Sequence, residues 1–348
     1  MAYTTINKST DYFNTKLYTG TGSSQAITGV GFQPDWVWAK RRGSAEGHSL
    51  FDAVRGVQKR IVSNDDGNET TIATSLTAFG SDGFTLGGND TVNGSDTYAS
   101  WNWKAGTAIS GATVGLGTLK TYTGSVNTTA GFSVIKYTGN GTAGHQFPHG
   151  LGVAPKMIMV KLLSGTSNWR VYHASQGATK EGLLDTSDAF ASASTTWNNS
   201  APNSNSMPLG TNTGTNGNDS TYVAYCFAEK TGFSKFGTYR GNITTDNTFI
   251  YTGFAPAFWM MKNTADPTNW MMFDSKRRAF NETQGYPLNA NETNAEDGGA
   301  TGYNYDFLSN GIKIRGSNNN FSKDDDYIYM AFASAPLVGS NNVPANAR

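Results

Sequence analysis

Cysteine is almost absent from this chain of 348 residues, and charged residues are scarce. Cys226 is the one cysteine, so no disulfide can form within the chain and no cysteine-rich zinc site can be built. Charged residues make up 15% of the sequence, and 26 Lys and Arg balance 26 Asp and Glu. A zero net charge argues against nucleic-acid binding, which requires a basic face.

Long apolar runs are also missing. No stretch approaches the roughly 18 apolar residues of a membrane helix. The segment from Met1 to Ile6 has neither the basic region nor the apolar run of a signal peptide. We therefore expect a protein that is made in a cytoplasm and does not insert into a membrane.

Small polar residues and aromatics dominate what is present. The chain has 41 glycines, and aromatic residues reach 12%. Ser, Thr, Asn and Gly supply turns, and aromatics favour strands, whereas long runs of good helix formers are missing. The composition predicts an all-β fold.

One sequence pattern recurs three times. Each copy contains Gly, two residues, Pro, five mostly large apolar residues and Lys, at 31–40, 152–161 and 253–262. Eighteen residues after each proline stand Asp52, His173 and Asp274. A closing block follows at 98–103, 222–227 and 327–332. A period of about 100 residues is the size of a small domain, so we interpret the copies as tandem domains.

The blocks predict strands, and each copy is expected to be a β-sandwich of the jelly-roll or lectin-like type with its own core. The Pro-to-Lys runs are apolar at nearly every position, which indicates a strand buried on both faces. Copies two and three are expected to pack tightly, with copy one offset. The predicted parts are an N-terminal arm (1–12), repeat 1 (13–105), a Gly/Thr/Ser-rich linker (106–130), repeat 2 (131–230), repeat 3 (231–336) and a C-terminal tail (337–348).

Few residues suggest chemistry. His145 and His149 could form a metal pair, but no further ligands are obvious, so no metal or cofactor is expected. The position shared by Asp52, His173 and Asp274 is interpreted as a repeated turn or strand-end hydrogen bond rather than three active sites. The recurring lysines Lys40, Lys161 and Lys262 are interpreted as strand-end residues that reach for solvent.

Two acidic segments, 64–69 and 323–326, could hold calcium, although neither has the spacing of an EF-hand loop. Most tryptophans lie inside the repeated blocks, which favours core packing. Trp197 lies in a long segment of Asn, Ser, Thr and Gly, and is the best candidate for an exposed ligand contact. No catalytic residue is predicted.

The blocks also resemble a known family. The segments 21–27, 36–40, 52–56, 81–87, 224–230 and 343–348 carry the resemblance. Together they resemble a family of tailed-bacteriophage proteins common in marine phages, usually labelled tail fibre or uncharacterised virion protein. The resemblance covers essentially the whole chain, and the family has no catalytic motif to transfer.

The resemblance implies a non-enzymatic virion structural protein. The first hypothesis is a tail fibre or receptor-binding component that contacts a host-surface glycan. The alternatives are a capsid decoration (head) protein and a surface-polysaccharide depolymerase. Expected partners are other virion proteins and further copies of the chain, with a homotrimer suspected; neither nucleic acid nor a membrane is expected.

Overall fold

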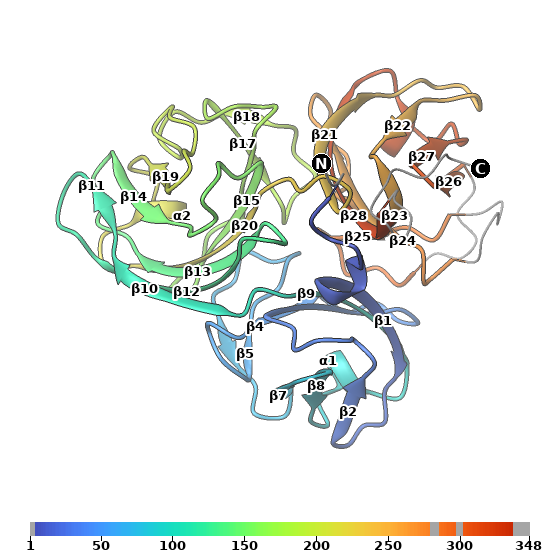
Figure 1. Cartoon of the computed structure of the whole chain (residues 1–348), viewed down its shortest axis with the longest axis horizontal. Helices are drawn as coiled ribbons and strands as arrows, with labels where there is room; N and C mark the ends of the chain where they lie inside the picture. The colour runs from blue at the N-terminus through green and yellow to red at the C-terminus, as the bar shows by residue number, and fades with distance from the viewer. Residues whose placement is uncertain (1–3, 279–284, 297–301, 337–348) are drawn as a thin grey trace.

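The structure is a computed structural model that describes residues 4–278, 285–296 and 302–336. Antiparallel strands account for nearly all of its regular structure, so the all-β prediction is confirmed. The predicted C-terminal tail, 337–348, lies outside the described residues. Three lobes surround a common centre, and the described N-terminal segment runs over that centre (Figure 1).

The first lobe (repeat 1) pairs a four-stranded main sheet with a three-stranded small sheet. The main sheet has the order β1(Phe13–Thr19), β9(Thr97–Trp103), β3(Trp36–Arg41), β4(Ser49–Asp52). The small sheet has the order β2(Gln25–Thr28), β8(Gly83–Leu86), β7(Leu76–Gly80). A short ribbon of β5(Lys59–Arg60) and β6(Thr70–Thr71) and two short helices, η1(Ser9–Asp11) and α1(Asp90–Asn93), complete it.

The second lobe (repeat 2) uses the same order and adds strands at both ends. Its main sheet runs β10(Thr107–Ala112), β12(Thr121–Asn127), β13(Phe132–Thr138), β20(Thr221–Phe227), β15(Met157–Leu162), β16(Arg170–His173), β17(Lys180–Leu183), β18(Ala191–Ser192). Its small sheet is β11(Val114–Gly115), β14(His145–Pro148), β19(Ser206–Leu209), with α2(Thr213–Asn216) alongside. The predicted linker at 106–130 is therefore wrong: this segment forms β10, β11 and β12.

The third lobe (repeat 3) repeats the order again. Its main sheet is β21(Ser234–Arg240), β28(Asp326–Pro336), β23(Phe254–Asn263), β24(Met271–Asp274), β25(Leu288–Asn289). Its small sheet is β22(Phe249–Tyr251), β27(Gly311–Ile314), β26(Tyr305–Leu308), with α3(Asn319–Ser322) nearby. Pro34 and Pro155 precede their strands, whereas Pro256 lies within β23 at a break in the register with β28, where a missing N–H is tolerated.

Each lobe contains a stacked pair of tyrosines at the equivalent place. Tyr98 stacks on Tyr18, and its hydroxyl donates to the carbonyl of Asp90 and accepts from the N–H of Gly94. The other two pairs are Tyr137 with Tyr222 and Tyr239 with Tyr327. Gly20, directly after β1, packs against the turn at Gly94. A Cβ at Gly20 would overlap the carbonyl oxygen of Gly94. These contacts fix the short helix against the main sheet.

The central strands of each main sheet are largely buried on both faces. In β3, Val37 and Ala39 face the small sheet of the first lobe, whereas Trp36 and Trp38 face the centre of the molecule. The same alternation divides β15 and β20 between an inner cluster and the central one. The central cluster joins residues of all three lobes, and the interior of the third lobe is continuous with it. The expectation that each copy buries its own core therefore holds for the first two lobes and is wrong for the third, and a further core is shared by all three.

Aromatic rings from different lobes are in direct contact at the centre. Trp36 of the first lobe stacks on Tyr225 of the second, with ring centroids 4.4 Å apart. Phe13 of the first lobe stacks on Phe332 of the third at 5.1 Å, and Phe227 of the second meets Phe332 at 6.0 Å. The first lobe is thus not offset from the others, because it contributes to the same core.

We predict that the second lobe does not fold alone. A fragment of residues 107–230 would expose Phe132, Met157, Met159, Tyr225 and Phe227, all now at most 1% exposed. Burial of such a side chain contributes about 1.5–3 kcal/mol. Near-UV circular dichroism and thermal unfolding of the fragment should show no cooperative transition, with the full chain as control. A sharp transition in the fragment would contradict the shared core.

Candidate functional site

Three loops hold the lobes together in a cycle. These docking loops are residues 62–69 after β5, 183–190 from the end of β17 and 289–296 from the end of β25, and each reaches into a neighbouring lobe. The N–H of Glu69 donates to the carbonyl of Leu163, that of Phe190 to Thr264, and that of Glu296 to Arg42. The first loop thus meets the second lobe, the second meets the third, and the third returns to the first.

At each of the three junctions, a side-chain ring nitrogen bonds a backbone carbonyl of the docking loop. Trp169 Nε1 donates to the carbonyl of Val62 at 2.8 Å, and Trp270 Nε1 donates to that of Leu183 at 2.7 Å. His48 occupies the same place in the first lobe, with Nε2 3.0 Å from the carbonyl of Asn289. Because Trp38 Nε1 can only donate, and lies 2.8 Å from His48 Nδ1, the imidazole is neutral and protonated on Nε2. His48 is therefore structural, and burial lowers its pKa.

The shared position of Asp52, His173 and Asp274 forms the predicted turn bond. Asp52 Oδ1 accepts from the N–H of Arg55 at 2.8 Å, and Asp274 Oδ1 accepts from that of Arg277 at 2.9 Å. His173 Nδ1 is 2.8 Å from the hydroxyl of Ser175. Burial lowers the pKa of His173 to about 4, so it is neutral at pH 7.

The two aspartates also bind across lobe junctions. Asp52 pairs with Arg55 and accepts from the hydroxyl of Tyr225 in the second lobe at 2.8 Å. Asp274 pairs with Arg277 at 2.5 Å and accepts from Trp101 Nε1 of the first lobe at 3.1 Å. These acids are fully buried, and each is neutralised by an arginine. They are components of the junctions.

The recurring lysines do not reach solvent, so that interpretation is wrong. Lys40, Lys161 and Lys262 are at most 1% exposed. Lys161 Nζ donates to the carbonyls of Asp66 and Ser167, both at 2.9 Å, and Asp66 belongs to the docking loop of the first lobe. Lys40 Nζ likewise reaches the carbonyl of Thr293 at 3.3 Å. Burial lowers the lysine pKa values to about 8 for Lys40 and Lys161 and about 7 for Lys262.

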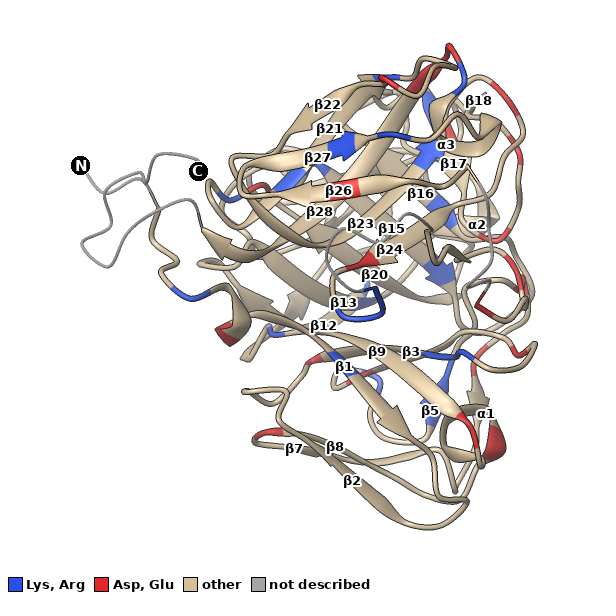
Figure 2. Ribbon diagram, turned by 90° about the vertical axis from the view of Figure 1, so that its right-hand side faces the viewer, with Lys and Arg blue, Asp and Glu red and all other residues tan. Residues whose placement is uncertain are grey.

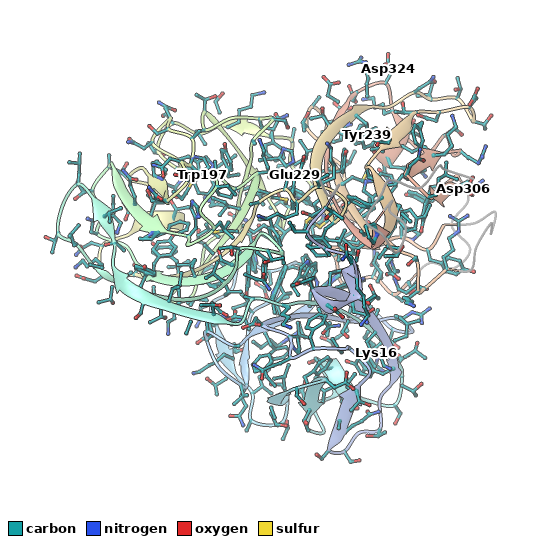
Figure 3. All side chains as sticks on the ribbon, in the orientation of Figure 1. Lys16, Trp197, Glu229, Tyr239, Asp306 and Asp324 are labelled. Carbon is teal, nitrogen blue, oxygen red and sulfur yellow. The ribbon has the colours of Figure 1, made fainter. Side chains whose placement is uncertain are left out.

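The histidine pair and Trp197 are also buried. His145 Nε2 lies 3.3 Å from the carbonyl of Thr138, and His149 Nε2 lies 3.0 Å from that of Asn203. Across the described residues no three His, Cys, Asp or Glu side chains come together as a metal site. Trp197 lies in the second lobe (Figure 3). It is 0% exposed and packs against Tyr172, so the expectation of an exposed contact is wrong.

Exposed aromatic residues lie instead on the third lobe. In β22, Phe249 is 43% exposed and Tyr251 is 54% exposed, while Ile250 between them is buried. Residues two apart on a strand share a face and are about 7 Å apart. Both aromatic side chains therefore stand on the outer face of the small sheet. Asp306, on β26 of the same sheet, lies at the outer side of the lobe (Figure 3).

The strand register sets two rows of side chains on this face. One row runs Phe249, Lys313, Asp306, and the other runs Tyr251, Gly311, Leu308. The ring of Phe249 lies close to Gly311, where a Cβ would be 2.8 Å from the ring and would overlap the carbonyl oxygen of Ile250. We call these six residues the aromatic face.

The charges around the aromatic face are paired locally. Lys313 Nζ donates to Asp246 Oδ1 at 2.8 Å, and this bond lowers the pKa of Asp246. Arg315 pairs with Asp306. In the ribbon of the described residues, segments with Lys and Arg and segments with Asp and Glu are interspersed (Figure 2). The aromatic face therefore combines apolar rings with hydrogen-bonding groups and little net charge.

The other two lobes show that the fold does not require these aromatics. Ile27 and Phe147 occupy the place of Ile250, as their pairing with Phe84 and Met207 shows. The residues flanking them are Ala26 and Thr28 in the first lobe, and Gln146 and Pro148 in the second. Aligning these short strands in the sequence would have revealed the aromatic pair. Exposed apolar residues gathered on one face are characteristic of binding surfaces.

Two hollows lined by described residues are small. One of about 210 Å³ lies over β12, β13 and the start of β20, and one of about 130 Å³ lies between the first and third lobes beside Phe13 and Lys276. Pockets for small-molecule ligands usually measure about 300–1,000 Å³. An open face is thus a better candidate site than either hollow.

Fold and surface together define an all-β protein of three two-layer lobes arranged in a closed ring. The chain belongs to the family described as domain of unknown function DUF7483, whose model matches residues 8–336. No curated protein and no solved structure matches the chain. The family match runs through all three lobes, which agrees with their common core. Among the described residues, no helix has the length and apolar character needed to cross a membrane.

The buried lysines predict a pH dependence of stability. Their pKa values of about 7 to 8 lie below the roughly 10.4 of an unfolded lysine. Between these values the unfolded state binds more protons, so the free energy of unfolding should rise with pH from about 7.5 to 9.5. Lys262→Met should reduce this slope by up to one proton, or about 1.4 kcal/mol per pH unit.

Urea denaturation at several pH values measures these slopes. The matched control is Lys8→Met, at a lysine whose side chain is 69% exposed, and its slope should equal that of wild type. An unchanged slope in the Lys262→Met variant would mean that the buried amine keeps its proton in the folded state.

Proposed function

We propose that this chain is a non-enzymatic structural protein of a tailed-bacteriophage virion, and that it serves host attachment by contacting a surface glycan. The sequence resemblance supports the virion setting. The observation that carries the binding role is the aromatic face, because only the third lobe places two exposed rings on this outer strand.

A sugar ring suits this surface chemically. The C–H groups on one side of a pyranose are apolar and pack against aromatic rings, and Tyr251 adds a hydroxyl at the edge. Lys313 and Asp306 stand in the same rows and can bond sugar hydroxyls. Since their charges are already paired, a neutral glycan is favoured over a strongly ionic one.

The buried acids support binding rather than catalysis. Glycoside cleavage needs two carboxyl groups flanking the sugar in an accessible cleft. Asp52 and Asp274 are buried in junctions, each with an arginine and an aromatic donor. Their buried position argues against a role for these two acids in polysaccharide cleavage.

Capsid decoration is the second candidate, and the ring arrangement is the observation that favours it. Three similar lobes around one centre match the symmetry of a three-fold position on an icosahedral shell (Figure 1). Immunogold labelling of intact virions separates the two: label on the tail supports attachment, and label over the whole head supports decoration.

The glycan proposal predicts the effect of replacing the two rings by the residues of the first lobe. Phe249→Ala combined with Tyr251→Thr should weaken binding to an array of immobilised bacterial surface glycans at least tenfold, because the stacking surface is removed. The matched control is Val57→Ala, which removes an exposed apolar side chain from the first lobe. Equal binding by all three proteins, or no binding by wild type to any glycan, would contradict the proposal.

A further inference from the structure

The outer strand of the second lobe has an open edge. β10 pairs with β12 on one side, and among the described residues no strand pairs with its other side. Five of its six residues are exposed, and Ile109 is half-buried against the interior of the lobe. An unpaired strand edge presents a row of backbone donors and acceptors that another strand can bind.

The edge lacks the charges that normally prevent such pairing. Residues 107–119 contain no Asp, Glu, Lys or Arg. Beyond β10 this segment also exposes Val114 at 42%, Leu116 at 64% and Leu119 at 52%. Charged side chains on edge strands, lysine above all, are a common defence against edge-to-edge pairing.

The other two lobes carry that defence at the corresponding edge. The first lobe ends at β1, which contains Lys16, and the third ends at β21, which contains Lys235 and Arg240. In the second lobe the corresponding strand is β13, which contains Lys136, but the hairpin of β10 and β12 covers it. The insertion thus replaces a charged edge by an uncharged one.

We propose that β10 pairs with β10 of a second copy of this chain, so that two eight-stranded sheets join into one across a two-fold axis. When the same edge is used by both partners, the contact is isologous and closes at a dimer. The two strands then run antiparallel. This assembly differs from the homotrimer suspected from the sequence.

The side chains of β10 permit the contact. Ile109 points toward the core of its own lobe, so Ala108, Ser110 and Ala112 stand on the opposite face. All three are small, so the joined sheets meet no bulky group there. Because the strand has no charge, antiparallel self-pairing brings no like charges face to face.

A charge exchange at Ser110 tests the proposal. Ser110→Lys and Ser110→Glu should each weaken dimerisation at least tenfold, because like charges then face each other across the axis. An equimolar mixture of the two variants should restore the dimer. Sedimentation equilibrium measures this as a change between the 37.2 kDa chain mass and twice that mass.

The matched control is Thr238→Lys, at an exposed position of the third lobe's edge strand β21, and it should dimerise like wild type. Circular dichroism and thermal unfolding must first show that every variant is folded. A wild-type protein that stays monomeric at all concentrations, or forms a trimer, would overturn the proposal. So would a Ser110→Lys dimer as tight as wild type, or a mixture that stays monomeric.

Discussion

The central aromatic core is the constraint on which the rest of the structure depends. Each main sheet places one row of large side chains against its own small sheet and the alternate row against the other lobes. Trp36 and Tyr225 illustrate the result, since their rings stack although they belong to different repeats. A strand apolar on both faces cannot be satisfied by a single two-layer sandwich, so the repeats must meet.

The docking loops follow from that meeting. Once the sheets converge, the strand ends that carry Lys40, Lys161 and Lys262 are buried, and their amines need acceptors. Backbone carbonyls of the loops supply part of them, and the ring nitrogens of Trp169, Trp270 and His48 supply the reciprocal donors. Polar groups at the junctions therefore serve assembly of the ring, which leaves the outer faces free to differ between lobes.

Sequence patterns predicted the local structure better than the way it assembles. The Pro-to-Lys runs and closing blocks form strands as predicted, because alternation and β-branched or aromatic content are local signals. The alternation of Trp36, Val37 and Trp38 could not show which face meets another repeat. The composition of residues 106–130 predicts a linker because Gly, Thr and Ser also occur in flexible segments, although Thr favours strands as well. The polar neighbours of Trp197 predict an exposed side chain, yet its large apolar ring is buried in the second lobe.

The closed cycle of docking loops has a consequence for synthesis of the chain. The first lobe needs Asn289, Thr293 and Glu296 to complete the junction around His48 and Arg42. These residues follow the groups that they contact by 241 to 254 residues in the chain, so they emerge from the ribosome much later. The junction around His48 and Arg42 must therefore stay incomplete until almost the entire polypeptide has been translated. Nascent chains interrupted before that point would be the aggregation-prone species, and rapid completion or a holding chaperone would decide the yield.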